Sequence, residues 1–458
     1  MKYTLHMTQQ HHDGLREHLF PGDRKEAVAL LLCGRRTGAE HHVLTVHKIV
    51  PIPHGVCDRH VERVTWPTEF VDALIGEAYE RGMALVKVHS HGVDYRRFSA
   101  TDDASDKALF ASIVSLLDDS LPHASLIMLP DGELFGRVLG EDGKITAPLA
   151  SVMVVGDDIR IWTERRLSQG SFALRHAQAF GSGTTDLLRS VSVAVVGCSG
   201  TGSFVAEQLA RLGVGRLVLV DPDIAEEKNL NRIVNCGKED VYLARPKVHV
   251  LASAIARMGL DQEVIALQQT LLTPEAVKAV AECDVAFGCL DGVEGRHVLN
   301  RIATFYLLPY FDVGVRLDAD GVGGIERIAG AVHYIQPGRS SLLSREVYSM
   351  ARVDAESLRR ANPEMYRRLI REGYLRGVDE DRPAVVSVNA FFASLAVNEF
   401  LARLHPYRNT PNRNYAYVAA NFSEMQFFTE PETAPCPLLQ KHVGRGDVVP
   451  LLERASLS

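Results

Sequence analysis

The run VAVVGCSGTG (residues 193–202), with LVLVD (217–221) shortly after it, decides the fold of the larger part of this chain. Four apolar residues followed by three glycines predict a buried strand and a tight turn, and residues 203–212 predict a helix. The second apolar run predicts a neighbouring parallel strand that ends at Asp221. Glycines at such a turn let backbone N–H groups approach phosphates, and the helix N-terminus favours their negative charge. The stretch therefore predicts a nucleotide-binding βαβ unit in which Asp221 accepts hydrogen bonds from ribose hydroxyls.

Polar residues that follow this unit indicate which nucleotide chemistry it performs. A dinucleotide-binding enzyme does not need an arginine, a lysine and a second aspartate facing the phosphates, whereas a site that splits ATP does. Cations stabilise the charge that develops on the triphosphate, and a carboxylate holds Mg²⁺. The candidates, in chain order, are Asp223, Asn229, Arg232, Lys247 and Asp291.

This constellation resembles the ThiF/MoeB family of adenylating enzymes, whose fold is shared with ubiquitin-activating enzymes. The resemblance covers about residues 170–440. It implies a Rossmann-like domain that forms an acyl-adenylate from ATP and the C-terminal glycine of a ubiquitin-like or sulfur-carrier protein, with release of pyrophosphate. By the same resemblance Gly197, Gly200 and Gly202 form the phosphate loop, Asp221 binds ribose with Asp223 beside it, Asn229 and Arg232 bind the phosphates, Lys247 acts on the α-phosphate, and Asp291 binds Mg²⁺.

Three features depart from the pattern of that family. Ser199 stands where a glycine is usual, and of an N-terminal arginine pair that can reach across a dimer only Arg175 is present. Two C-x-x-C pairs that hold a structural zinc in many members are absent. No cysteine lies between Cys289 and Cys436, so no thiol stands where the family carries its thioester nucleophile. We therefore expect direct transfer from the adenylate to sulfur, an amine or another protein's thiol, with Cys236 and Cys436 as the only plausible acceptors on this chain.

A second motif, HSH at residues 89–91 followed by Ser99 and Asp102, lies in the first third of the chain. Two imidazoles and a carboxylate at this spacing supply three zinc ligands and leave the fourth position open, as a catalytic zinc requires. The apolar pattern places the histidines at the end of a strand (83–88) and Asp102 at the start of the next helix. Upstream, Glu26 precedes an apolar strand, where a carboxylate is either exposed or used.

These residues resemble the JAB/MPN metalloproteases, also called JAMM, which fold as a small α/β domain around a curved sheet. Members cut peptide or isopeptide bonds after the C-terminal glycine of ubiquitin or its relatives. The resemblance implies Zn²⁺ as a cofactor. It assigns His89, His91 and Asp102 as zinc ligands, Glu26 as the base and Ser99 as the oxyanion helper.

The two motifs and the polar, turn-rich stretch near residue 145 predict an α/β chain with two domains, 1–155 and 165–458, and the composition predicts that it is soluble. The 458 residues are 46% hydrophobic and 23% charged, which suffices for two or three cores. The net charge of −7 argues against binding to nucleic acid through its phosphates. No apolar run is long enough to span a bilayer, and seven cysteines without a C-x-x-C pair predict a reducing cytoplasm.

The two resemblances together lead to a bifunctional hypothesis. The protease trims a ubiquitin-like or sulfur-carrier protein, or removes it from a target, and the second unit adenylates the exposed glycine with ATP and Mg²⁺. Two alternatives stay open: a peptide-modifying adenylyltransferase whose protease unit matures the peptide, and a nicotinamide-dependent oxidoreductase. A homodimer through the adenylation unit is also expected. The apolar residues Phe391, Phe392, Leu395 and Val397 on a predicted helix (383–404) either form that contact or are buried within the monomer.

Overall fold

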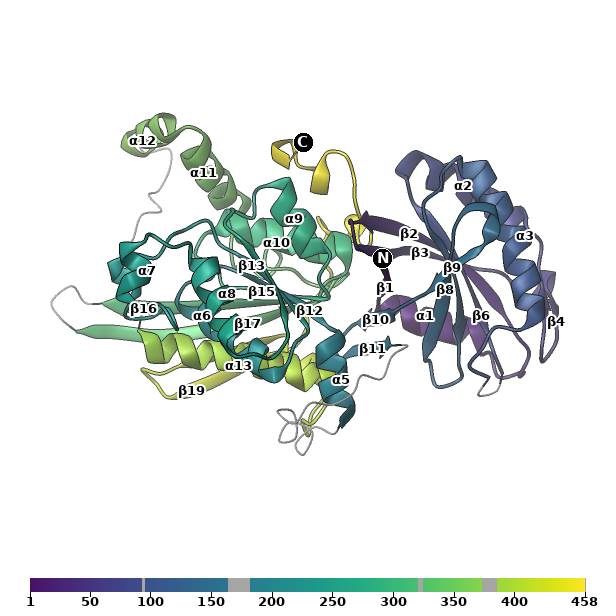
Figure 1. The fold of residues 1–458 in the computed structure, drawn as a ribbon, viewed down its shortest axis with the longest axis horizontal. Coiled ribbons are helices and arrows are strands. Elements are labelled where there is room, and N and C mark those ends of the chain that lie inside the picture. The colour runs from purple at the N-terminus through teal and green to yellow at the C-terminus, as the bar shows by residue number, and fades with distance from the viewer. Residues whose placement is uncertain (93–94, 164–181, 320–323, 373–384, 458) are drawn as a thin grey trace.

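The structure, a computed structural model, describes residues 1–92, 95–163, 182–319, 324–372 and 385–457. These residues fold around two large sheets, each covered by helices. Figure 1 shows the N-terminal unit in purple and blue beside a second unit in teal and green. The first sheet has nine strands and the second has eight. The expected fold class, an N-terminal α/β domain followed by a Rossmann-like domain, is confirmed. Arg175 lies outside the described residues.

The N-terminal unit is built on a mixed sheet and a separate two-stranded hairpin, and an inner strand of the mixed sheet leads into the metal-ligand motif. Its elements are β1 (Lys2–Thr8), α1 (Gln9–Leu19), β2 (Val28–Thr37), β3 (His41–Pro51), β4 (Asp58–Arg59), β5 (Val64–Thr65), α2 (Glu69–Arg81), β6 (Ala84–Ser90), α3 (Ala100–Leu117), β7 (His123–Met128), β8 (Leu134–Leu139), β9 (Ile145–Pro148), β10 (Ser151–Val155) and β11 (Ile159–Thr163). β6 pairs with β2 antiparallel and with β7 parallel, and all of its residues are buried. The apolar faces of α2 and α3 pack on one side of the sheet, and α1 packs on the other.

The second unit has the predicted strand–turn–helix run at its centre. Its elements are α5 (Ser182–Ser190), β12 (Ser192–Val196), α6 (Gly200–Leu212), β13 (Arg216–Val220), α7 (Lys238–Tyr242), α8 (Lys247–Arg257), β14 (Glu263–Leu267), α9 (Pro274–Ala281), β15 (Val285–Gly288), α10 (Val293–Tyr306), β16 (Tyr310–Ala319), β17 (Ile325–Ile335), α11 (Met350–Ala361), α12 (Pro363–Arg371), α13 (Val386–Leu404), β18 (Tyr417–Asn421) and β19 (Gln426–Glu430). Five parallel strands, β14-β13-β12-β15-β16, continue into the antiparallel strands β17-β18-β19.

The order of the parallel strands places the glycine turn at a topological switch point. β12 lies between β13 and β15, with α6, α8 and α13 packed on one face of the sheet and α9 and α10 on the other. Loops that leave the carboxyl ends of β12 and β15 diverge at such a point and leave a crevice for a ligand. The glycine turn follows β12, Asp291 follows β15, and the other candidate nucleotide residues follow the carboxyl end of the neighbouring strand β13.

The packing of α13 shows whether its apolar residues form a dimer contact or are buried within the monomer. Phe392 and Val397 are buried, and Phe391 and Leu395 pack against the same cluster, which also contains Leu209 of α6. Burial within the monomer therefore accounts for all four side chains, and they provide no argument for a dimer. The expected dimer stays a prediction that rests on the family resemblance alone.

The C-terminal strap, defined as residues 443–447, joins the two units. Gly444 accepts hydrogen bonds at its carbonyl from Gly34 N (3.2 Å) and Thr45 Oγ1 (3.0 Å), and its N–H donates to Thr304 O (3.1 Å). One residue of the strap thus contacts β2 and β3 of the first unit and α10 of the second. In Figure 1 the yellow C-terminal segment accordingly lies between the two sheets.

The first sheet extends further along the chain than the expected domain end at residue 155. β11 pairs with β10, so the sheet continues to Thr163. The first described element beyond it is α5, and we place the boundary between Thr163 and α5. Within the described ranges, no helix has both the length and the apolar character that crossing a bilayer requires.

Candidate active sites

The three predicted zinc ligands lie at one point. His89 is near the end of β6, His91 follows that strand, and Asp102 is in the first turn of α3. The Nε2 atoms of the two histidines are 3.2 Å apart, and Asp102 oxygens lie 3.1 Å from His89 Nε2 and 3.8 Å from His91 Nε2. Tetrahedral zinc with Zn–N bonds of about 2.0–2.1 Å places its ligand atoms about 3.3 Å apart. The spacing of these three side chains therefore fits three of the four ligand positions around a zinc ion.

Burial and hydrogen bonding favour the metal-binding forms of His89 and Asp102, and a hydrogen bond sets the tautomer of His91. His91 Nδ1 is 3.0 Å from Tyr95 O, and a hydrogen bond there leaves the Nε2 lone pair free for a metal. Burial lowers the pKa of His89, which favours the neutral imidazole. Burial raises the pKa of Asp102, but hydrogen bonds from His89 and His91 outweigh it, so this pKa lies well below its usual range. Elsewhere in the described ranges, no other three His, Cys, Asp or Glu side chains lie close enough to share an ion.

Ser99 positions one of these ligands. Its hydroxyl donates to Asp102 Oδ2 (2.7 Å), its backbone N–H donates to the same oxygen (2.8 Å), and Asp102 N donates to Ser99 Oγ (3.1 Å). This reciprocal capping box starts α3 and fixes the rotamer of Asp102. The hydroxyl that the resemblance assigns to the oxyanion is thus engaged with the aspartate in this structure.

Glu26 is buried, with 7% of its surface exposed, just before β2. The β4–β5 hairpin holds its backbone, because Glu26 N donates to His60 O (2.8 Å) and Arg59 Nε donates to Glu26 O (2.8 Å). Burial raises the pKa of the Glu26 carboxyl to about 7, and the charge of Asp102 adds to this shift. The sequence left open whether this carboxylate is exposed to solvent or has a function, and its burial excludes the first explanation.

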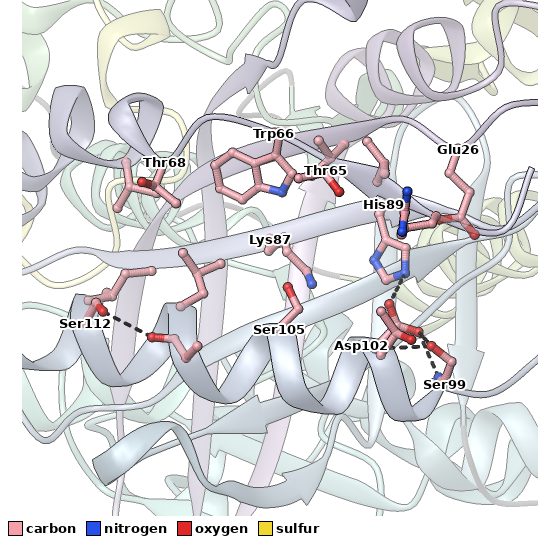
Figure 2. Close-up of a pocket in the computed structure, with 18 of the residues that line it drawn as sticks. Glu26, Thr65, Trp66, Thr68, Lys87, His89, Ser99, Asp102, Ser105 and Ser112 are labelled. Atoms are coloured by element: carbon pink, nitrogen blue, oxygen red, sulfur yellow. Dashed lines mark hydrogen bonds and ion pairs between the residues drawn. The ribbon is translucent and has the colours of Figure 1, made fainter. Parts of the chain in front are cut away.

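A groove of about 470 Å³ opens beside the ligands (Figure 2). At one end of the groove, Figure 2 shows Glu26 and His89 on one side and Asp102 with Ser99 on α3 opposite them. From there the groove continues along α3 towards α2 and the β4–β5 hairpin. Its walls combine apolar, small polar and charged side chains, among them Trp66, Ile113, Ser105, Lys87 and Glu62.

A buried charge network under the groove was missed from the sequence. Lys87, whose side chain lines the groove, forms an ion pair with Asp106, and Arg137 Nη2 lies 2.6 Å from the same carboxylate. Arg137 also stacks on Phe98, 3.8 Å from the ring centre, immediately before Ser99. The network therefore supports the start of α3. A lysine inside the apolar run ALVKV was the signal that could have revealed it.

The glycines of the nucleotide turn are required for the turn itself to close. Gly197 has φ +91°, and a Cβ there would lie 2.4 Å from Cys289 O. A Cβ on Gly202 would lie 1.7 Å from Gly197 O. The turn thus packs backbone on backbone and presents the free N–H groups of the α6 N-terminus, a cradle that fits phosphate.

Three predicted residues meet beside this turn. Asp221 accepts hydrogen bonds from Cys198 N (2.7 Å) and Asp223 N (2.9 Å). Lys247, the first residue of α8, lies 2.7 Å from Asp223 Oδ2 and 4.0 Å from Asp221 Oδ1. Burial raises the pKa of Asp221. The structure therefore brings a cation and two carboxylates to the carboxyl end of β13.

The other candidates have different surroundings. Asn229 is buried, and its Oδ1 accepts a hydrogen bond from Glu226 N (3.0 Å), so its side chain shapes the local turn. Arg232 is partly exposed, and its Nη1 donates to Lys228 O (2.6 Å). Asp291 is exposed in the loop after β15, the loop whose backbone abuts the glycine turn.

Neither candidate thioester cysteine is well exposed. Cys436 is buried, and Cys236 is half-buried with a pKa that burial raises. A thiolate is the form that attacks an adenylate, and a raised pKa disfavours it at Cys236. Direct transfer from the adenylate stays our expectation.

A carboxylate-centred network occupies the region where the family's structural zinc pairs are expected. Glu432 accepts hydrogen bonds from Gln336 Nε2 (3.2 Å), Ser340 N (3.3 Å) and Ser340 Oγ. Arg345 donates to both Glu432 oxygens (3.2 Å each) and to Ser340 Oγ (2.7 Å). Cys436 is the single cysteine nearby in the sequence, and its backbone N–H donates a hydrogen bond to Arg339 O (3.0 Å). These residues do not supply the thiolates of a structural zinc site. The polar network joins residues 336–345 to Glu432 instead.

Removing the central charge of this network should destabilise the second unit. We expect Glu432→Gln to lower the free energy of unfolding by about 3 kcal/mol, because a nearly buried Arg345 loses its counter-charge. Urea denaturation followed by circular dichroism measures the change. Glu424→Gln, at an exposed site, is the matched control. A chelator that destabilises this unit while Glu432→Gln does not would show that a metal holds the two segments.

Two family models match the chain. The ThiF family matches residues 173–438, and the prokaryotic homologs of the JAB domain match residues 8–137. The first stretch contains the glycine turn, Asp221, Lys247 and Asp291. The second contains Glu26 and the three candidate zinc ligands.

Named relatives match shorter stretches. Adenylyltransferase and sulfurtransferase MOCS3 of Sus scrofa is 37% identical over 113 residues, which is 25% of this chain and 24% of that protein. Ubiquitin-like modifier-activating enzyme 5 of Culex quinquefasciatus is 28% identical over 166 residues (34% and 39%), and the tRNA threonylcarbamoyladenosine dehydratase of Bacillus subtilis (strain 168) is 42% identical over 94 residues (20% and 36%). The chain thus spans less than half the length of each relative. Among solved structures, E. coli MccB with ATP has a TM-score of 0.43 at 18% identity, over 59% of this chain and 74% of that one.

Proposed function

The chain belongs to the ThiF family, and on this premise we propose that it processes and then activates a ubiquitin-like or sulfur-carrier protein. The second unit adenylates the C-terminal glycine of that protein with ATP and Mg²⁺, and the JAB-like unit is a zinc-dependent protease or isopeptidase acting on its tail. The observation that carries the proposal is the triangle of His89, His91 and Asp102, which lies with Glu26 at one end of a groove. A trimmed tail is the substrate that the adenylating unit requires.

In the proposed hydrolysis the substrate tail lies in the groove with its scissile carbonyl at the ligand triangle. Zinc, when bound there, polarises that carbonyl as a Lewis acid. Glu26 takes a proton from the attacking water and returns it to the leaving nitrogen, so that amide and water become carboxylic acid and amine. Ser99 lies at the groove wall and helps hold the oxyanion once its hydroxyl turns from Asp102.

In the proposed activation the glycine carboxylate attacks the α-phosphorus of ATP. The new oxygen–phosphorus bond forms as the bond to pyrophosphate breaks. Lys247 and Arg232 offset the charge that develops, and Asp291 holds Mg²⁺. Lys247 lies beside Asp223 and Asp221, and an incoming triphosphate offers it a stronger anionic partner.

A precursor with extra residues after its C-terminal glycine tests both halves together. We expect ATP–pyrophosphate exchange to start only when the chain has removed the extension. Exchange that proceeds equally well with an uncleavable extension would contradict the proposed order, and preference for NAD over ATP with Mg²⁺ would favour the oxidoreductase alternative. Exchange with short peptides but with no ubiquitin-like protein would favour the peptide-modifying alternative.

Zinc should bind at one site per chain. The three ligands form one cluster, and the network around Glu432 has no metal-binding thiols. Elemental analysis of the purified protein should therefore give one zinc, and His91→Ala should lose it. His249→Ala, at an exposed histidine of the second unit, should keep it. Two zincs per chain, or an unchanged content in His91→Ala, would contradict the assignment.

The same resemblance and the composition lead to proposals for the oligomeric state, the cell compartment and the acceptor of the adenylate. We propose that two copies pair through the adenylation unit, that the chain acts in the cytoplasm, and that no nucleic acid or membrane takes part. The adenylate passes directly to sulfur, an amine or a partner's thiol.

A further inference from the structure

The first turn of α13 contacts the glycine turn from a distant part of the sequence. Asn389 has 5% of its surface exposed, and its Oδ1 accepts a hydrogen bond from Thr201 Oγ1 (3.3 Å). Thr201 is the second residue of α6, the helix whose N-terminus faces the proposed phosphates. A polar side chain from α13 is thus placed at the predicted nucleotide site, although none of the nucleotide motifs includes it.

The amide of Asn389 occupies the space that a side chain at position 200 would fill. A Cβ on Gly200 would lie 2.4 Å from Asn389 Nδ2 and 3.3 Å from Arg232 Cδ. Gly200 is therefore required for Asn389 and Arg232 to reach the turn together. The resemblance assigns this glycine to phosphate binding, and the structure adds a second reason for it.

The donor of this amide is available for a ligand. Its oxygen is used by Thr201, while Nδ2 makes no hydrogen bond to another residue in the described parts of the chain. The first N–H groups of α6 lie at the same place and also lack partners within their helix. An amide donor on a nearly buried side chain, next to such N–H groups and an arginine, suits a multiply charged oxyanion.

We propose that Asn389 contacts the nucleotide, with Nδ2 donating a hydrogen bond to an oxygen of the triphosphate. The inference rests on the proposed ATP site and adds a phosphate-binding residue to it. Hydrogen bonds to charged groups contribute about 1.5–3 kcal/mol, which corresponds to about 10- to 100-fold in a dissociation constant. The contribution should grow with the number of phosphates and vanish for adenosine.

Calorimetric binding of a non-hydrolysable ATP analogue with Mg²⁺ tests the proposal. Asn389→Ala should weaken binding about 10- to 100-fold, and Asn389→Asp should weaken it further, because it keeps the shape and the acceptor but replaces the donor with a charge. Asn398→Ala is the matched control, since Asn398 lies on the same helix, is exposed, and its side-chain Nδ2 donates a hydrogen bond to Ser394 O (2.8 Å), away from the glycine turn. Adenosine binding should be unchanged in all three variants.

The outcomes separate this inference from the proposed function. If the wild-type chain binds no ATP analogue, the proposed function fails. If the wild type binds the analogue and Asn389→Asp binds it equally well, the proposed function stands and the phosphate contact is wrong. Equal losses for adenosine and the analogue would also overturn the contact, since they indicate that Asn389 only supports the turn. Asn389→Asp keeps the test valid if Asn389→Ala does not fold.

Discussion

Replacing Glu26 with Gln should slow hydrolysis of a ubiquitin-like precursor by about 10²–10⁴-fold, the usual loss when a general base is removed. Glu26 is buried beside the groove, and hydrogen bonds from the β4–β5 hairpin fix its backbone. Gln has the same shape and keeps those backbone contacts, but it cannot take a proton from water. The zinc content should stay at the wild-type value, because the three proposed ligands are unchanged.

The measurement is cleavage of the precursor at saturating zinc, together with elemental analysis of the same samples. Asp72→Asn is the matched control, since Asp72 lines the same groove, is exposed and is not among the groups whose charge shifts the pKa of Glu26. Its rate should lie close to that of the wild type. Cleavage by Glu26→Gln at the wild-type rate would mean that another group is the base, and equal losses in both variants would point to substrate binding.

Replacing Asp291 with Ala should reduce ATP–pyrophosphate exchange by at least about 10²-fold, a loss typical of removing one electrostatic contact to a transition state. Asp291 is exposed, and it follows β15 in the loop whose backbone packs against Gly197. The carboxylate is therefore available to Mg²⁺ at the phosphate cradle. The fold should be unchanged, because the side chain is exposed and the largely buried Arg296 keeps Asp312 as its partner (3.4 Å).

Exchange should be measured with a partner supplied already trimmed, so that the protease step does not enter. Under this condition Glu26→Gln should exchange at the wild-type rate. Asp354→Ala, at an exposed aspartate of α11, is the control for a lost surface charge. Exchange that survives in Asp291→Ala would reject the proposed Mg²⁺ ligand and require another carboxylate near the turn.

The sequence by itself determined the elements that carry both sites. The strand, turn and helix around Gly197 follow from local apolar patterning and from glycines that a tight turn demands. The position of His89 at a strand end and of Asp102 at a helix start follows in the same way. A pattern within ten or fifteen residues specifies such features, because backbone geometry repeats with a fixed period.

The tertiary structure alone decided what these elements contact. Burial of Glu26 depends on a hairpin some 35 residues away in the sequence. Arg345 and Glu432 join two distant segments, and Asn389 contacts the glycine turn across 188 positions. Packing also assigned Phe392 to the monomer core, a choice that helical periodicity left open. No local pattern encodes these pairings, because they arise only when the whole chain closes its loops and fills its cores.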